Sequence, residues 1–260
     1  MGKSKDKVLV IASSDPKGGA GMQADLATLK DFNVPTAFAV TAITAQGENE
    51  VLSIHPTPVD ILTQQLSAAS ADQDIGAIKI GVVSTSANVR ALVWFLHREK
   101  SIPIVIDPVL HSSSGASLLE TKGVPVFRQQ LLPLATVITP NLLEASALVG
   151  MQVASLDQMH EAAGKIYKEL IMLRGVGGEK KPLAIVIKGG HLRGDAVDLV
   201  YDGKEFVELR ENRIPGRSPR GAGCRFASGI AAGLAQKKSV MDSIEAAKRY
   251  MTNFISKHSK

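Results

Sequence analysis

KVLVIASSDPKGGAGMQADLATLKDF, residues 7–32, contains the pattern from which the fold class follows. It begins with a short apolar run that ends in small residues, which is typical of a buried β-strand. A glycine-rich segment follows, and after it Met22, Leu26, Leu29 and Phe32 recur at helical spacing. The stretch therefore predicts a strand, a loop and a helix, in that order.

The same alternation of strand-like and helical patterns continues along the whole chain. Strand-like runs are predicted over residues 36–45, 77–81, 102–109, 135–141 and 182–190. Helical patterns cover residues 58–70, 86–99, 142–150, 156–173, 221–236 and 239–256. In the first of these helices Ile61, Leu62 and Leu66 are expected on one face. Residues 196–209 predict a hairpin that turns at Asp202-Gly203.

Apolar strands that alternate with helices predict an α/β fold with a mostly parallel sheet, covered by helices on both faces. In such sheets ligands bind beyond the carboxyl ends of the strands. Several polar residues follow the predicted strands and are expected at that edge: Ser13 to Asp15, Gln46, Asp107, Asn141, and Lys188 to His191. This shared position is the main sign of a binding site in the sequence.

Composition narrows the classes of function. The chain has 260 residues and a formal net charge of +5, and only 4% of its residues are aromatic. So few aromatic residues offer no stacking platforms among the cations, which argues against a nucleic-acid partner. The apolar runs are too short for a membrane span or a signal-peptide core, so we expect a cytoplasmic protein without a membrane partner.

The single cysteine lies in SPRGAGCRFASG, residues 218–229, between two glycines and an apolar helical pattern. The backbone N–H groups of Gly221, Ala222 and Gly223 open that helix and are expected to form an anion hole. The alternative is that these small residues only allow the helix to pack closely against its neighbours, and the sequence supports both interpretations equally. A helix N-terminus also favours a thiolate, so we expect the pKa of Cys224 to be lowered toward neutrality.

Charged residues near these motifs have two interpretations each. Arg220 and Arg225 flank the glycine loop, where they either contact phosphates or are simply solvated. Asn141 and Glu144 are spaced to lie on one face at a helix start, as a helix-dipole match or as part of a Mg²⁺ site that acts through water. A cysteine hydrolase would pair Cys224 with a histidine, but no local signature of that class surrounds the thiol.

No Walker A loop and no G-x-G-x-x-G after a strand is present in the sequence. Instead the motifs SSDPKGGAGMQADL, TAITAQ, KIGVV, DPV with a later SSG, TPNLLEA, IKGGH and GAGC occur in this order over nearly the whole chain. Together they resemble the hydroxymethylpyrimidine/phosphomethylpyrimidine kinase family of thiamine biosynthesis, within the ribokinase-like superfamily. The resemblance implies one ribokinase-like domain over residues 1–260, a three-layer α/β/α sandwich.

The resemblance also implies a reaction, in which ATP with Mg²⁺ phosphorylates 4-amino-5-hydroxymethyl-2-methylpyrimidine and then its monophosphate. Family members are often dimers, so a homodimer is expected. By position in the family motifs, Cys224 would act as base for the substrate hydroxyl. The other implied roles are pyrimidine contacts at Asp25 and Gln46, ring walls at Ala20, Val82 and Val109, phosphate contact at Lys188, and Mg²⁺ with its waters at Asn141, Glu144 and Asp107.

The chain departs from the family pattern at several of these positions. Where the family usually has His-Gly-Thr-Gly-Cys-Thr, residues 220–225 of this sequence are Arg-Gly-Ala-Gly-Cys-Arg. Ser13 stands in place of a glycine, and His111 in place of an aliphatic residue. We expect Arg225 to contact a phosphate. The alternatives are a pyridoxal kinase with the same fold and cysteine, and a weakly active pyrimidine-binding regulatory homologue.

Overall fold

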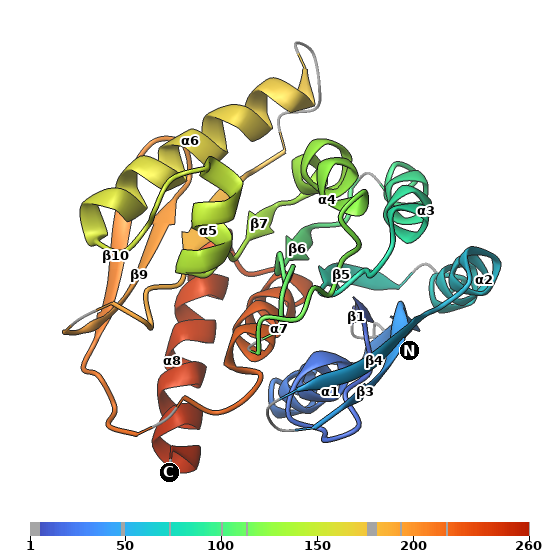
Figure 1. The fold of residues 1–260 in the computed structure, drawn as a ribbon, viewed down its shortest axis with the longest axis horizontal. Helices are drawn as coiled ribbons and strands as arrows, with labels where there is room; N and C mark the ends of the chain where they lie inside the picture. The colour runs from blue at the N-terminus through green and yellow to red at the C-terminus, as the bar shows by residue number, and fades with distance from the viewer. Residues whose placement is uncertain are drawn as a thin grey trace.

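The computed structural model describes residues 6–47, 50–72, 74–99, 101–112, 114–175, 181–192, 194–216 and 218–259. Its centre is an eight-stranded sheet, shown in Figure 1, in the order β10-β9-β8-β7-β6-β5-β1-β2. The strands are β1 (Lys7–Ala12), β2 (Thr36–Val40), β5 (Ile75–Ile80), β6 (Ile104–Ile106), β7 (Val137–Ile138), β8 (Ala184–Ile187), β9 (Ala196–Tyr201) and β10 (Phe206–Glu211).

Strands β1, β2, β5, β6, β7 and β8 pair in parallel, and the β9–β10 hairpin continues the sheet in antiparallel fashion. This confirms the mostly parallel sheet and the hairpin that the sequence predicts. The sheet uses strands from both ends of the chain, which is compatible with one domain, although the domain division itself stays a prediction.

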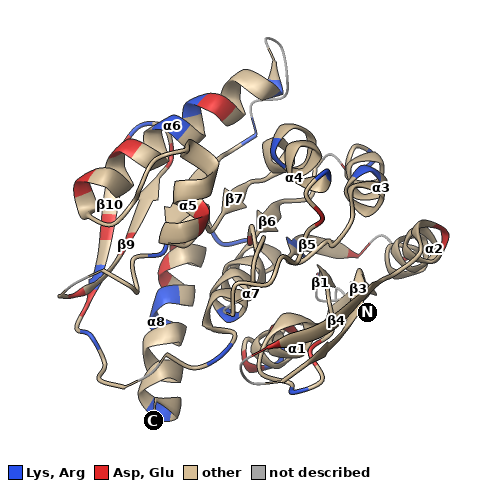
Figure 2. Ribbon diagram, in the orientation of Figure 1, with Lys and Arg blue, Asp and Glu red and all other residues tan. Residues whose placement is uncertain are grey.

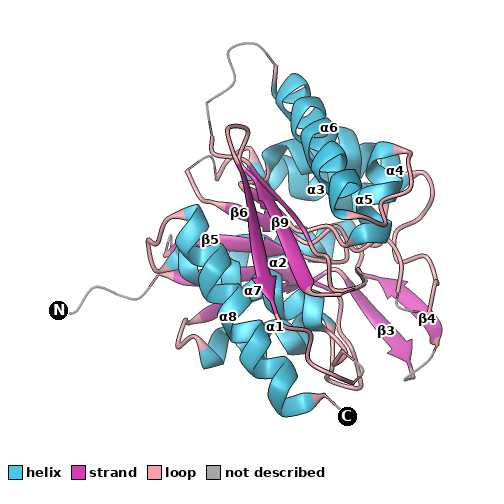
Figure 3. Cartoon of the chain, turned by 90° about the vertical axis from the view of Figure 1, so that its left-hand side faces the viewer, coloured by secondary structure: helices cyan, strands magenta, loops and turns pink. Residues whose placement is uncertain are grey.

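Helices cover both faces of the sheet (Figures 1 and 3). The helices are α1 (Gly21–Asp31), α2 (Val59–Ala69), α3 (Ser86–Leu96), α4 (Gly123–Val126), α5 (Leu142–Val149), α6 (Leu156–Arg174), α7 (Ala222–Ala235) and α8 (Val240–His258). A π-helical turn (Phe127–Leu131) and a 3-10 turn (Leu132–Leu134) follow α4. The two faces form separate cores, because successive residues of a strand point to opposite sides. On β1, Leu9 and Ile11 enter one core, while Val8 and Val10 enter the other.

The run at residues 36–45 is not one strand, as the sequence pattern predicts, but two. β2 ends at Val40, and β3 (Ala42–Gln46) pairs with β4 (Val51–Pro56) in a separate two-stranded sheet. Thr41 marks the break: its amide donates to the Ala12 carbonyl, and its hydroxyl donates to the Val82 carbonyl at 2.5 Å. The amide hydrogen bond continues the β1–β2 ladder by one step, and the chain leaves the main sheet after it.

Helix α2 differs from its prediction in one residue of the buried face. Leu62 and Leu66 are buried as expected, but Ile61 is 44% exposed. Within the described residues, no helix has both the length and the apolar composition that crossing a membrane requires.

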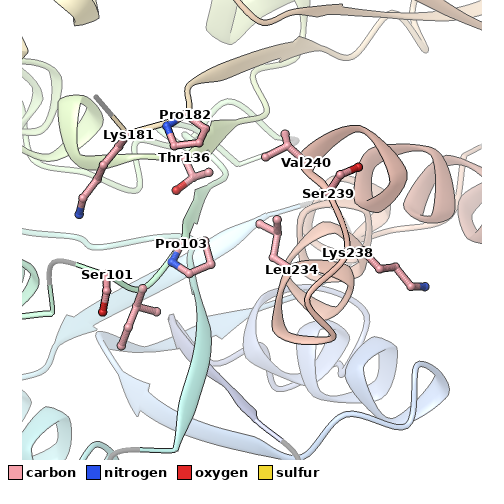
Figure 4. Close-up of a pocket in the computed structure, with 10 residues that line it drawn as sticks. Ser101, Pro103, Thr136, Lys181, Pro182, Leu234, Lys238, Ser239 and Val240 are labelled. Atoms are coloured by element: carbon pink, nitrogen blue, oxygen red, sulfur yellow. The ribbon is translucent and has the colours of Figure 1, made fainter. Parts of the chain in front are cut away.

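An open hollow of about 600 Å³ lies at the amino-terminal end of the sheet (Figure 4). Pro103, Thr136 and Pro182 precede β6, β7 and β8 and line it on one side, and Leu234 and Ser239 from the α7–α8 turn line the other. None of the residues predicted to bind a ligand lines this hollow. Asp107, Asn141 and Lys188 instead follow β6, β7 and β8, at the opposite end of these strands.

Candidate active site

The carboxyl ends of neighbouring strands bring the predicted polar residues together. Asp107 follows β6, Asn141 follows β7 and Lys188 follows β8, and these three strands are adjacent in the sheet. An isolated parallel bridge joins Asn141 to Lys188, so the ladder continues to the site itself. This confirms the prediction that these residues share one edge of the sheet, where the carboxyl ends of parallel strands meet.

Lys188 lies between two carboxylates. Its Nζ is 2.7 Å from Oδ1 of Asp107 and 4.0 Å from Oε2 of Glu144. Asp107 also accepts a hydrogen bond from the Thr139 hydroxyl at 3.1 Å. In Figure 2 acidic and basic segments of the ribbon meet beside α5, where this cluster lies.

The cluster holds more negative than positive charge, and its pKa values reflect this. Burial opposes the charge of Lys188, but the Asp107 and Glu144 carboxylates outweigh that effect and raise the pKa of Lys188. Burial raises the pKa of Glu144 to about 7, and Asp107 adds to the rise while Lys188 opposes it. The site therefore favours an additional cation or an additional proton.

Asn141 and Glu144 form a capping box at the start of α5. The Asn141 side chain accepts from the Glu144 amide at 2.9 Å, and Oε2 of Glu144 accepts from the Asn141 amide at 2.7 Å. This reciprocal arrangement satisfies two free donors of the helix end. It also fixes the Glu144 carboxylate toward Lys188.

Whether Mg²⁺ fits beside Lys188 depends on which side-chain oxygen atoms are free to bind it. Within the described residues no group of three or more His, Cys, Asp or Glu is placed to hold a metal ion alone. The capping box already occupies the Asn141 side-chain oxygen. Mg²⁺ commonly uses one or two carboxylates together with waters and substrate phosphates, and Asp107 and Glu144 fit that mode. Asn141 fits as the residue that orients Glu144.

The start of α7 lies directly against this cluster. A Cβ atom on Gly223 would be 3.0 Å from Nζ of Lys188 and 3.6 Å from Oδ2 of Asp107, so a side chain at this position would crowd the ion pair. Gly221 has a positive φ of 77°, and a Cβ there would lie 2.1 Å from the Gly19 carbonyl oxygen. The glycines therefore allow the helix N-terminus to approach both the lysine and the glycine-rich loop.

Cys224 is half-buried in the first turn of α7. The expectation of a lowered pKa is wrong: burial raises the pKa of the thiol to about 11. Lys79 and the Gly21 amide oppose the rise, whereas Asp25 and Asp107 add to it. The helix N-terminus alone does not outweigh the loss of water and two nearby carboxylates.

A fully buried ion pair lies near Cys224 and was not predicted from the sequence. Nζ of Lys79 is 2.7 Å from Oδ2 of Asp25, and both side chains have no exposed surface. Oδ1 of Asp25 accepts from the Ser228 hydroxyl of α7 at 2.8 Å. A lysine inside the apolar strand run AIKIG was the available signal, because a lysine in a strand buried on both faces needs a partner.

This pair gives Asp25 a structural role. Asp25 lies on the buried side of α1, is 0% exposed, and both of its oxygens accept hydrogen bonds from other elements. It neutralises Lys79 and ties α1 to β5 and α7. Its contact with the pyrimidine stays a prediction.

We expect Asp25→Ala to lower the free energy of unfolding by about 3–5 kcal/mol, because it leaves a buried lysine without a counter-charge. Urea denaturation of the variant measures the loss. The double variant Asp25→Leu/Lys79→Met should recover most of it. An Asp25→Ala protein as stable as the wild type would show that the pair does not hold these elements together.

The other residues predicted for the pyrimidine remain accessible or near the surface. Ala20 precedes α1, Gln46 ends β3 and Val109 follows β6, and each is partly exposed. Val82 follows β5 and is 8% exposed. Their contacts with a ligand stay predictions.

We expected Arg225 to contact a phosphate at the anion hole, but its side chain points elsewhere. Its Nη1 lies 3.4 Å from the Ala24 carbonyl and 3.3 Å from the Thr28 hydroxyl, and its guanidinium stacks over Phe254 at 4.4 Å from the ring centre. The side chain is only 9% exposed. One step along a helix rotates a side chain by about 100°, so Arg225 faces α1 and α8 rather than the site of Cys224.

The parallel sheet, the helix N-terminus and the lysine–carboxylate cluster at one edge together define a ribokinase-like kinase. A family model described as phosphomethylpyrimidine kinase matches residues 15–260. The chain belongs to this phosphomethylpyrimidine kinase family, which confirms the resemblance seen in the sequence.

Individual relatives support the same assignment. The hydroxymethylpyrimidine/phosphomethylpyrimidine kinase of Aquifex aeolicus is 36% identical over 97% of this chain and 94% of its own length. An ADP complex of Bacillus subtilis pyridoxal kinase superposes with a TM-score of 0.84 at 35% identity, over 97% of this chain and 92% of that one. A Clostridium difficile phosphomethylpyrimidine kinase superposes with a TM-score of 0.80 at 32% identity, over 96% of this chain and 100% of that one.

Proposed function

We propose that this kinase transfers the γ-phosphoryl group of ATP to the hydroxymethyl group of 4-amino-5-hydroxymethyl-2-methylpyrimidine, and then to its monophosphate. The observation that carries the proposal is the contact between the α7 N-terminus and the Lys188 cluster. Phosphoryl transfer requires mainly positioning of the reactants and neutralisation of charge. A helix N-terminus beside a lysine supplies both.

At the nucleotide end, the amides of Gly221, Ala222 and Gly223 would donate to phosphate oxygens. Lys188 would neutralise the same phosphates, because its ammonium already lies against Gly223. Mg²⁺, when bound, would offset the negative charge that the phosphoryl group develops. Asp107 and Glu144 would hold that ion and its waters.

At the acceptor end, Ala20, Val82 and Val109 would contact the pyrimidine ring, and Gln46 would hydrogen-bond its amino group and ring nitrogen. Cys224 would accept the proton of the attacking hydroxyl. Because the pKa of this thiol is about 11 in the free protein, its thiolate form is scarce at neutral pH. The base function then predicts a rate that rises with pH.

We expect Gln46→Ala to weaken pyrimidine binding by about 5- to 150-fold, since an unpaired buried polar group costs roughly 1–3 kcal/mol. Affinity for the nucleotide should change by less than about twofold. Calorimetry with each ligand measures both effects. Leu52→Ala serves as the control, because Leu52 lies on the partner strand of the same hairpin and is 68% exposed. Equal pyrimidine affinity in the Gln46 variant and the control would remove Gln46 from the pocket.

Pyridoxal is the second candidate acceptor. The similarity to Bacillus subtilis pyridoxal kinase, with a TM-score of 0.84, favours it, because two kinases with this fold are about equally similar to the chain. A weakly active pyrimidine-binding regulatory homologue receives less support. The altered surroundings of the Gly-Ala-Gly-Cys turn suggest it, but one of the two arginines there, Arg225, packs against Phe254 instead of the transfer site.

A thermal-shift screen tests which ligands the free site accepts. The pyrimidine alcohol and pyridoxal are each added with and without a non-hydrolysable ATP analogue and Mg²⁺. The proposal predicts a larger rise in Tm with the pyrimidine than with pyridoxal, and a further rise with the nucleotide. A shift with pyridoxal alone would favour the second candidate.

A further inference from the structure

Arg220 joins three separate segments at the mouth of the site. Its Nη1 donates to the Gly47 carbonyl at 2.7 Å, at the tip of the β3–β4 hairpin. Its Nη2 is 3.5 Å from Oδ2 of Asp15, in the glycine-rich loop after β1. Its own backbone directly precedes Gly221, where the anion-binding turn begins. The fork of the guanidinium allows one side chain to reach both partners.

Hydrogen bonds within the glycine-rich loop hold Asp15, the partner of Arg220, in place. The Asp15 carboxylate has no exposed surface and accepts from the Lys17 amide at 3.0 Å and the Ala20 amide at 2.8 Å. A Cβ on Gly19 would lie 3.3 Å from Cδ of Arg220, so the arginine stem packs along the loop. Arg220 itself retains 29% of its side-chain exposure, as expected at the rim of a site.

The hairpin needs such an attachment, because it stands apart from the main sheet (Figure 3). Near its base the Thr44 hydroxyl donates to the Ser14 carbonyl at 2.6 Å, and the Ser14 amide donates to the Ala42 carbonyl at 2.9 Å. Among the hydrogen bonds of the described residues, the Arg220 contact is the one that ties the tip to the rest of the chain. Gln46 is next to that contact.

We propose that Arg220 is a positioning residue that latches the β3–β4 hairpin to the glycine-rich loop and the α7 turn. The latch holds Gln46 at the distance from the anion hole that the pyrimidine acceptor requires. The identity of the acceptor rests on the proposed function, whereas the latch rests on the contacts of Arg220 alone. It assigns to Arg220 a role in acceptor recognition rather than in phosphate contact.

Arg220→Ala tests the latch by kinetics and by hydrogen exchange. The KM of the pyrimidine should rise about tenfold, the size expected when one charge-assisted hydrogen bond is lost. The KM of ATP and kcat should change by less than about twofold. Backbone amides of residues 42–47 should exchange about tenfold faster, while those of α7 should not change.

Lys17→Ala is the matched control, because Lys17 is an exposed cation on the same loop. It removes one charge near the mouth without touching the latch and should leave all these quantities unchanged. A rise in the KM of ATP, equal effects of both variants on the pyrimidine KM, or unchanged exchange of the hairpin would each overturn the proposal. If the wild type phosphorylates no pyrimidine, the proposed function fails, and the exchange experiment still decides whether the latch exists.

Discussion

Replacing Cys224 with alanine is expected to lower kcat by about 10²–10⁴, the usual contribution of a positioned general base. The KM of ATP should stay within about twofold, because the backbone amides of residues 221–223 remain in place. The fold should tolerate the change, since the thiol is half-buried and alanine fits its space. Coupled ADP release at saturating pyrimidine measures kcat.

The pKa of Cys224 allows the base assignment to be tested independently through the pH dependence of the rate. A thiol with a pKa of about 11 in the free protein loses its proton only as the pH rises toward that value, so wild-type kcat/KM should increase between pH 6 and pH 9. The rate of alkylation by iodoacetamide should rise over the same range. Cys224→Asp places a stronger acid at the position and should show a much flatter pH profile. If Cys224→Ala keeps near-wild-type kcat, the anion hole suffices and the base assignment is wrong.

Lys188→Met is expected to lower kcat by about 10²–10³, comparable to the loss of one group that stabilises the transition state. The variant also leaves the buried Asp107 and Glu144 carboxylates without their cation. Breaking a buried pair in this way typically costs about 3–5 kcal/mol of unfolding free energy. Urea denaturation and steady-state kinetics on one preparation separate the two effects.

The stability loss of Lys188→Met should depend on pH. The pKa of Glu144 in the folded protein is about 7, above its ordinary 4.5, so between these values the native state binds more protons than the unfolded state. Stability therefore falls as the pH rises through this range, and more steeply without the lysine. Lys188→Met/Glu144→Gln keeps the capping geometry and should regain stability but not kcat. Recovery of kcat in the double variant would contradict a direct role for Lys188.

The sequence predicts the layers of the fold and the edge at which the site forms. In the strand run at residues 182–190 the apolar residues 183–187 are followed directly by Lys188, and the parallel ladder places that lysine beside Asp107. The break at Thr41 is not visible in the apolar pattern, and the Thr41 hydroxyl finds its partner at Val82, far along the chain. Long-range partners of this kind carry no local signal.

The wrong expectations for the direction of Arg225 and for the pKa of Cys224 share a physical cause. Family position indicates where a residue lies along the chain, but not which way its side chain faces or what surrounds it. Arg225 is one residue from Cys224 and faces a different helix. The pKa of Cys224 depends on the balance between burial and the charges of Lys79, Asp25 and Asp107, which come from three other segments.

Coupled ADP release with matched acceptors measures directly whether this kinase phosphorylates the pyrimidine. Purified wild-type protein is given ATP and Mg²⁺ with either the pyrimidine alcohol, its monophosphate or pyridoxal, and each product is identified by mass. We expect one ADP per phosphorylated pyrimidine, with a kcat/KM at least about tenfold higher for the pyrimidine alcohol than for pyridoxal. Phosphorylation of pyridoxal alone, or binding of the pyrimidine without any ADP, would contradict it.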